Sequence, residues 1–398
     1  MEDSQPSRSS NLDHPIKKKS NLDHAGNFTP NIPLDLTIEI LARLPGNSII
    51  RFQYVSKLWF SIIRTKDLTD SFLTRSKTRP RLLFTFKHFD SRKRFIFSAP
   101  EHQKNEKSST VVARHDMTIS DLIYYIRCRP VNGFICCTRG SSIAVCNPTT
   151  RQIVKLPDVV SNKRNVYARL GYDPLKDQYK VLCVMMFRGC NANQPDIQQE
   201  HYVFTLSSQQ KEWRKIEITQ GVTYNMVREG ICIDGAIYYC DGRSGIVRFD
   251  VRSEKLELIQ TPKGSDIAHF SALINYNGKL GGVEYECSGE IVLWILEDAE
   301  KHKWSEMACP LAFEWSDLLG DHITSNGEIH TGELMVVNPG LRSSKPFSVC
   351  YYDFNRESIR KVEVKGIGDD EFRRVHGIGK RTREMLCFPG YVENIKFL

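Results

Sequence analysis

The first apolar segment of the chain, residues 32–64, has the spacing of helices rather than of strands. In its opening part Leu36, Ile40 and Leu44 recur at a spacing of four residues, with Ile38 and Leu41 beside them. On one helix, begun by Asp35 as N-cap, these side chains would cover about half of the circumference, which is wider than the ~100° stripe of an ordinary surface helix. Pro45-Gly46 would end that helix.

Two further helices are expected in the same segment. A short one would begin at Asn47 or Ser48, and a third would run from about residue 53 to residue 64. Three short helices make a very small domain, which buries too little of its surface to be stable on its own. They also carry more apolar surface than they can hide from each other, and an excess of this kind marks a binding site for a partner.

From Arg81 onward the apolar period changes to two, which is the period of strands. Turn signals separate the strand-like segments: Asn132-Gly133, Asn147-Pro148, Asp173-Pro174, Asp234-Gly235, Asn277-Gly278 and Asn326-Gly327. No amphipathic helix is evident among them. Short strands with frequent turns predict an all-β sandwich, barrel or propeller.

A repeat favours the propeller among these three. An apolar strand that ends in Asp or Asn, a tight turn and a second strand recur, with the second strands ending near residues 156, 216, 258, 307 and 360. Trp213 and Trp304 take equivalent places in two of these units. The spacing resembles the ~50 residues of kelch-type blades. Together with the strands before residue 130, this predicts about six four-stranded blades, in a ring that the strand at Met385 could close.

Composition adds few constraints to this picture. Residues 1–29 are polar and expected to be disordered, and the domains that follow are expected at 30–75 and 80–398. The net charge of +8 is mild and scattered, which argues against nucleic acid as a partner. Twelve cysteines without a C-x-x-C pair predict reduced, buried thiols in a cytoplasmic or nuclear protein. No segment has the length of a membrane span, and neither a cofactor nor a metal is expected.

The helical segment resembles a known motif, the F-box. The matching residues are Ile32-Pro-Leu-Asp-Leu-Thr-Ile-Glu-Ile-Leu-Ala-Arg-Leu-Pro45 and Ser48-Ile-Ile-Arg-Phe-Gln-Tyr-Val-Ser-Lys-Leu-Trp59. The motif's leucine is replaced by Ile32, and Gly46-Asn47 replaces its frequent Val-Lys. The resemblance implies that this segment binds a Skp-family adaptor, which sits on a cullin scaffold with its RING subunit. By position in the motif, the adaptor contacts would be Pro33, Leu36, Ile40, Leu41, Leu44, Pro45, Ile50, Val55 and Trp59, although some of these could be core residues instead.

The remainder of the chain resembles the plant F-box-associated domain. The matching pieces are Val131-Asn-Gly-Phe-Ile-Cys-Cys, Val145-Cys-Asn-Pro-Thr-Thr-Arg-Gln, Leu170-Gly-Tyr-Asp-Pro and Tyr179-Lys-Val. This resemblance implies a non-catalytic adaptor that holds an unknown protein substrate near a ubiquitin-conjugating enzyme. Candidate substrate loops are the polar insert from Cys190 to Glu200 and the loop with Phe313 and Trp315.

Three other functions remain open at this stage. A propeller-fold enzyme would need a site assembled from distant loops, because the chain lacks H-E-x-x-H, G-x-S-x-G and P-loop motifs. A metal site could be built from Asp321, His322, Glu328 and His330, although surface loops often carry such residues without a metal. Gly366-Ile-Gly368 and Gly377-Ile-Gly379 could grip a phosphate of a nucleic acid, but glycines of this kind more often serve turns. An F-box protein could also act as a scaffold outside a ligase.

Overall fold

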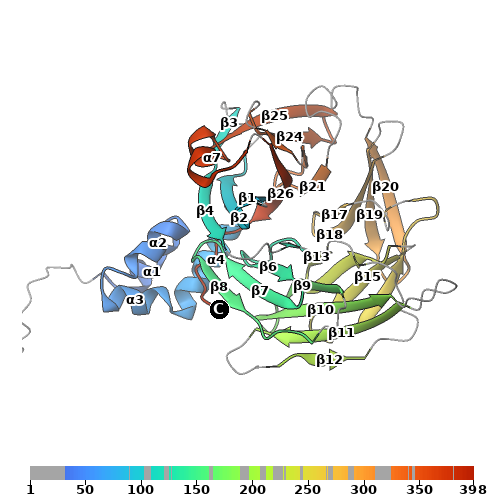
Figure 1. Ribbon diagram of the computed structural model, residues 1–398, viewed down its shortest axis with the longest axis horizontal. Coiled ribbons are helices and arrows are strands. Elements are labelled where there is room, and N and C mark those ends of the chain that lie inside the picture. Colours follow the sequence, from blue (N-terminus) through green and yellow to red (C-terminus); the bar gives the residue numbers. More distant parts are fainter. Residues whose placement is uncertain are drawn as a thin grey trace, which may run out of the picture.

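The computed structural model describes most of the chain in two parts, a small helical domain and a ring of sheets (Figure 1). The described residues are 32–88, 90–102, 109–120, 125–126, 128–160, 165–188, 197–206, 212–217, 227, 230–242, 245–265, 267, 272–285, 291–309, 324–338, 340–342, 346–379 and 381–398. The tail expected at 1–29 lies outside them.

Four helices form the N-terminal domain. They are α1 (Leu34–Ala42), α2 (Gly46–Phe52), α3 (Lys57–Ile63) and α4 (Lys66–Lys77). The expectation of three helices was therefore wrong by one. The fourth helix buries only Leu68, Phe72 and Ser76, and its one other apolar residue is Leu73, so its apolar period is too sparse to stand out in the sequence. Thr65 caps it by accepting a hydrogen bond from the Leu68 amide.

The helix starts also differ from the expected caps. Pro33 and Pro45 occupy the N-cap positions of α1 and α2, and neither can offer a side-chain cap, whereas Asp35 lies inside the first turn of α1. The third helix is capped by Ser56, whose hydroxyl accepts a hydrogen bond of 3.2 Å from the Trp59 amide. A proline fits these helix starts because its fixed φ suits the first turn and its missing N–H is not needed there.

Six sheets of four or five strands make up the rest of the described chain, which agrees with the expected number of blades. The first sheet contains β1 (Arg81–His88), β2 (Lys93–Pro100), β4 (Arg114–Ile119), β23 (Leu341–Arg342) and β26 (Arg381–Tyr391). The second contains β5 (Tyr125–Ile126), β6 (Ile135–Arg139), β7 (Ser142–Asn147) and β8 (Gln152–Lys155). The third contains β9 (Asn165–Asp173), β10 (Gln178–Arg188), β11 (Ile197–Thr205) and β12 (Arg214–Ile216).

The other three sheets follow in chain order around the ring (Figure 1). The fourth contains β13 (Gly230–Ile233), β14 (Ala236–Cys240), β15 (Gly245–Asp250) and β16 (Leu256–Gln260). The fifth contains β17 (Ala272–Tyr276), β18 (Lys279–Tyr285), β19 (Ile291–Asp298) and β20 (Lys303–Cys309). The sixth contains β21 (Thr324–Glu328), β22 (Leu334–Val337), β24 (Ser348–Asp353), β25 (Ser358–Lys365) and β3 (Thr110–Val112). The architecture is a six-bladed β-propeller; the kelch type of its blades stays a prediction.

The two ends of the propeller sequence close the ring. Strand β26 pairs antiparallel with β1, so that Phe84 lies opposite Cys387 and the chain's last strand shares a sheet with its first. This pairing confirms the expected role of the strand at Met385. A second closure was not expected: β3 adds to the edge of the sixth blade and runs parallel to β25. Each pairing joins strands from opposite ends of the propeller sequence within one sheet, and in this way the ring is closed.

The repeated Asp or Asn at strand ends has a common structural cause. Asn147, Asp173, Asp298 and Asp353 each accept a hydrogen bond on Oδ1 from a backbone amide two residues on, at about 3.0 Å. A short acceptor at this place closes the turn that carries the chain into the next strand of the same blade. The repeat in the sequence is therefore a repeat of this turn.

The two tryptophans do occupy equivalent places. The Trp213 indole precedes β12 and donates a 2.8 Å hydrogen bond to the Pro157 carbonyl, which follows β8 of the preceding blade. The Trp304 indole in β20 donates a 2.9 Å hydrogen bond to the Gln260 carbonyl, at the end of β16 of its own preceding blade. Each indole thus links the outer strands of two neighbouring blades.

Within the described ranges a helix interrupts the strand series, contrary to expectation. Helix α7 (Asp370–His376) begins at the N-cap Asp369 and ends at Gly377, which has a left-handed φ of 65°. Its Phe372 packs edge-on against Phe95 at a ring distance of 5.0 Å. Gly366 and Gly368 also have positive φ angles, so the glycines that could have suggested phosphate binding serve turns.

The described cysteines are buried thiols in most cases. The nine cysteines whose side chains the structure describes are all free, and eight of them are buried. Burial raises the pKa of Cys183 and of Cys232 to about 12, so these thiols stay protonated and unreactive. No helix within the described ranges is both long and apolar enough to cross a membrane.

Candidate functional site

An exposed apolar surface lies on the N-terminal helical domain. Large apolar side chains between residues 32 and 60 keep between 44% and 82% of their surface exposed. They are Ile32, Leu34, Leu36, Ile40, Tyr54, Val55, Leu58 and Phe60, and we call this group the apolar face. Exposed apolar side chains outside the F-box are scattered singly, as in Val112 of β3, Ile153 of β8, Val160 and Val375 of α7. A concentrated group of this kind is typical of a protein-binding site.

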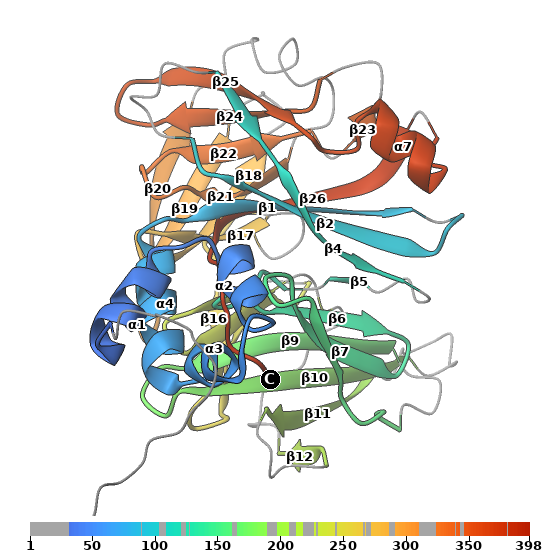
Figure 2. The same ribbon diagram turned by 90° about the vertical axis from the view of Figure 1, so that its left-hand side faces the viewer.

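The apolar face lies on the part of the helical domain that projects from the propeller. Helix α4 lies next to the sheets, and α1, α2 and α3 project from it (Figures 1 and 2). The loop between α2 and α3 contributes Tyr54 and Val55. Together with Leu58 of α3, they are the three most exposed members of the apolar face. A partner could therefore approach α1 and α3 without contacting a blade.

The structure divides the nine residues that the motif resemblance implied as contacts. Five are exposed: Pro33, Leu36, Ile40, Pro45 and Val55. Leu44, Ile50 and Trp59 are half-buried against the helical core. Only 2% of the Leu41 surface is exposed, and the residue belongs to the helical core. In this structure it therefore packs beneath the apolar face and is not part of it.

Sequence reasoning did not select several exposed members of the apolar face. Leu34, Tyr54 and Leu58 are at least as exposed as Leu36 and Ile40, which were selected, and Phe60 is only slightly less exposed. Their chemistry is evident in the sequence, but which side of a seven-residue helix faces out depends on how the helices pack. The added helix α4 settles this by covering the other side.

A small core holds the apolar face in shape. Its buried members are Leu41, Ala42, Ile49, Ile62, Ile63, Leu68, Phe72 and, from the far end of the chain, Ile395. The Phe52 and Trp59 rings pack at 5.5 Å between α2 and α3. The helical domain therefore does not have a core of its own, because a residue that follows the last propeller strand completes it.

Charged residues connect α1 to α4 at the edge of the face. Glu39 accepts hydrogen bonds from Arg43 at 2.7 Å and from Arg75 of α4 at 2.8 Å. The hydrogen bond from Arg43 and the charge of Arg75 lower the pKa of Glu39. Arg79 donates to the Arg43 carbonyl at 3.0 Å and so caps the end of α1. These contacts are exposed, so they orient the helices more than they stabilise them.

The alternative sites receive no support from the described residues. His330 Nδ1 lies 2.6 Å from Glu101 Oε2, a buried carboxylate that also accepts from the Gly390 amide. Among the described residues no group of three or more His, Cys, Asp or Glu could hold a metal ion, and Asp321 and His322 lie outside them. Residues 190–196, Phe313 and Trp315 of the candidate substrate loops also lie outside, while Ile197–Glu200 open strand β11.

Comparison with known proteins agrees with this arrangement of helices and sheets. Residues 30–71 match the F-box domain, and residues 81–392 match the F-box associated beta propeller domain. F-box protein At1g30790 of Arabidopsis thaliana is 36% identical over 96% of this chain and 100% of its own length. F-box protein DOR of the same plant is 36% identical over 96% of this chain and 98% of its own. The relatives thus share both domains in the same order.

The two family matches cover the helical domain with its apolar face and nearly all of the ring of six sheets. The relatives are named as F-box proteins and align along almost their whole length. The chain belongs to the family of F-box proteins that carry an F-box associated β-propeller domain.

Proposed function

We propose that this chain is the substrate-recognition subunit of a Skp–cullin–F-box ubiquitin ligase. The F-box would bind a Skp-family adaptor, and through it a cullin and a RING subunit. The propeller would hold a target protein. The chain itself would perform no chemistry and would need no cofactor, and it would act in the cytoplasm or the nucleus.

The apolar face is the observation that carries this proposal. Leu36 and Ile40 of α1 are each about half exposed, at 52% and 51%, although leucine and isoleucine are normally among the most buried residues. Tyr54, Val55 and Leu58 extend the same exposed group through the α2–α3 loop into α3. A second protein that covered this face would bury a compact apolar patch, as the centre of a stable interface requires.

The mechanism would be one of proximity. A ligase subunit that holds a target close to a ubiquitin thioester raises the effective concentration of the target's lysines. Two requirements follow for this chain: the F-box must bind its adaptor, and the propeller must stay at a fixed position relative to the F-box. The first can be tested at the apolar face.

The double variant Leu36→Ala with Ile40→Ala should weaken binding to a purified Skp-family adaptor. Because each side chain is already half-buried, the adaptor would cover only the remaining half, and the pair should contribute about 1.5–3 kcal/mol. The dissociation constant, measured by isothermal titration calorimetry, should therefore rise about 10- to 150-fold.

A matched control is Val160→Ala with Val375→Ala, which truncates two exposed apolar side chains of the propeller. This control should bind the adaptor as the unchanged chain does, and circular dichroism should show both variants folded. Undiminished binding by the Leu36/Ile40 variant would refute the apolar face as the docking surface. A wild-type chain that binds no Skp-family adaptor would refute the ligase function.

A further inference from the structure

The last seven residues of the chain lie between the two domains instead of ending in solvent. After β26 the chain leaves its sheet, and Val392, Glu393, Asn394 and Ile395 are all buried. Figure 2 shows this segment running down beside the F-box helices to the C-terminus. We call residues 392–398 the C-terminal strap.

Amide side chains attach the strap to the second blade. Asn147 Nδ2 donates to the Asn394 carbonyl at 2.8 Å and to the Lys396 carbonyl at 3.0 Å. Asn394 Nδ2 donates to the Asn132 carbonyl at 2.7 Å, and Gln152 exchanges two hydrogen bonds with Leu398. These bonds satisfy the polar groups of a buried irregular segment, which would otherwise be costly.

A glycine makes room for the strap at the same blade. Gly133 has a φ of +86°, and a Cβ on it would lie 2.7 Å from the Asn394 Cβ and from the Val392 carbonyl oxygen. The turn Asn132-Gly133 therefore requires glycine for two reasons: its positive φ angle and the close approach of the strap, which leaves no room for a Cβ.

The other side of the strap enters the F-box. Ile395 is completely buried and packs with the core formed by the four F-box helices. Glu393 Oε2 accepts a 3.2 Å hydrogen bond from the Gly46 amide at the start of α2, and its Oε1 accepts a 2.7 Å bond from Arg114 of β4. A single carboxylate thus contacts an F-box helix and a propeller strand at once.

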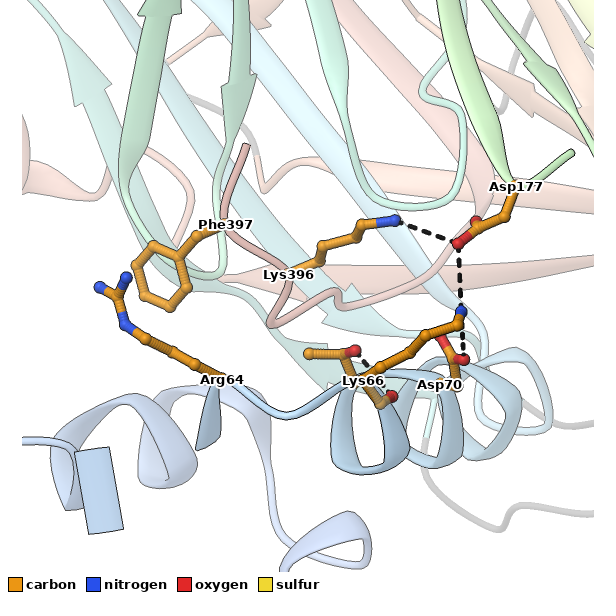
Figure 3. Close-up of a pocket in the computed structure, with 7 residues that line it drawn as sticks. Arg64, Lys66, Asp70, Asp177, Lys396 and Phe397 are labelled. Atoms are coloured by element: carbon orange, nitrogen blue, oxygen red, sulfur yellow. Dashed lines mark hydrogen bonds and ion pairs between the residues drawn. The ribbon is translucent and has the colours of Figure 1, made fainter. Parts of the chain in front are cut away.

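A cluster of charges continues the junction on its solvent side (Figure 3). Asp177, in the turn after β9, lies 3.3 Å from Lys66 of α4 and 3.4 Å from Lys396 of the strap. The Arg64 guanidinium lies 4.3 Å from the Phe397 ring. These groups line a cavity of about 330 Å³. The ion pairs are exposed and individually weak, so the buried Ile395 and Glu393 must hold the junction.

We infer that the C-terminal strap is a structural part of the F-box and positions it on the propeller. Ile395 completes the core behind the adaptor-binding surface, and Glu393 fixes the direction in which that surface faces. The structural role of the strap does not depend on the proposed function. Only its consequence does, namely that adaptor binding and substrate placement both require the strap. The dependence of the F-box on Ile395 is a property of the free chain.

Hydrogen exchange of the full-length chain tests the first part of the inference. Ile395→Val and Ile395→Ala remove progressively more of the buried side chain. Amides of α1–α3 should exchange faster in both variants. The increase should be at least about 30-fold in the alanine variant, because truncating a core isoleucine to alanine lowers stability by an amount that corresponds to such a factor. Amides of β10 and β14 should exchange as in the unchanged chain. Unchanged exchange in the helices, or an equal increase in the blades, would overturn the inference.

The positioning role needs a second measurement. Spin labels introduced as non-natural amino acids at the exposed Lys57 and Ser358 leave the native thiols untouched. Double electron–electron resonance should give one narrow distribution of label-to-label distances for the unchanged chain and a broad one for Glu393→Ala. The width for Glu393→Gln should be closer to that of the unchanged chain. Equal widths in all three would overturn the positioning role. Neither measurement uses the adaptor, so failure of adaptor binding would count against the proposed function alone.

Discussion

Glu393 shows how one side chain can depend on both domains. Burial alone would raise its pKa, but the hydrogen bond from Arg114 and the positive charge of Arg81 bring it below the ordinary value of 4.5. A carboxyl with a lowered pKa in the folded state adds stability above its unfolded pKa and loses it as the pH falls through the folded value. This contribution is therefore complete at neutral pH and disappears below about pH 4.5.

The variant Glu393→Gln should lower the free energy of unfolding by about 1–3 kcal/mol at pH 7, because glutamine has no charge for Arg114 and keeps only one of the two acceptor oxygens that bind Arg114 and the Gly46 amide. The difference from the unchanged chain should shrink as the pH falls below about 4.5, since the unchanged carboxyl then becomes neutral as well. Urea unfolding at a series of pH values measures this difference. The exposed Glu371→Gln of α7 serves as control and should show little effect at any pH. A pH-independent difference for Glu393→Gln would exclude a charged Glu393.

At the scale of elements, the strand series was largely predictable because most strands have a local pattern of apolar residues followed by turn residues. Strand β10 has buried apolar side chains along most of its length, and Asn277-Gly278 takes positive φ angles of 50° and 82°, as its hairpin turn requires. Helix α4 was missed because only three of its twelve residues are buried. Strand β3 was missed because three residues paired in parallel with a distant strand leave no local pattern.

The indole hydrogen bonds allow a test of the links between blades. Trp304→Phe and Trp213→Phe each remove one hydrogen bond of 2.8–2.9 Å while keeping an aromatic ring. Each should lower the free energy of unfolding by about 1 kcal/mol, and the effects should add within about 0.5 kcal/mol because the two sites share no partner. Urea unfolding of the single and double variants measures both. A cost for one tryptophan and none for the other would show that the two places are not equivalent.

At the scale of the whole molecule, the polar N-terminal segment should be dispensable. Removal of residues 1–29 leaves the first described residue, Ile32, and every contact of the apolar face in place. Adaptor affinity by calorimetry and the melting temperature should therefore both stay unchanged. A loss of adaptor binding in the shortened chain would show that the binding unit begins before Ile32, contrary to the F-box motif.

The candidate site could be predicted only in part, and the division has a simple cause. The motif indicated which segment forms the F-box, because helix period and helix-ending residues are local properties. It could not separate Leu36, which is exposed, from Leu41, which is buried, since both lie on the same wide apolar arc. Only the packing of α4 and Ile395 against α1 distinguishes them.

The sequence by itself determined the two-domain order, the change from helices to strands near Arg81 and the six-fold repeat of blades. Each of these depends on residues that are close together in the chain. The tertiary structure alone decided that β26 pairs with β1, that β3 joins the sixth blade and that residues 392–398 enter the F-box. Ile395 and Ile49 are about 350 residues apart, and no local pattern relates two apolar residues at that separation. Their contact exists because closing the ring brings the end of the chain back to its beginning.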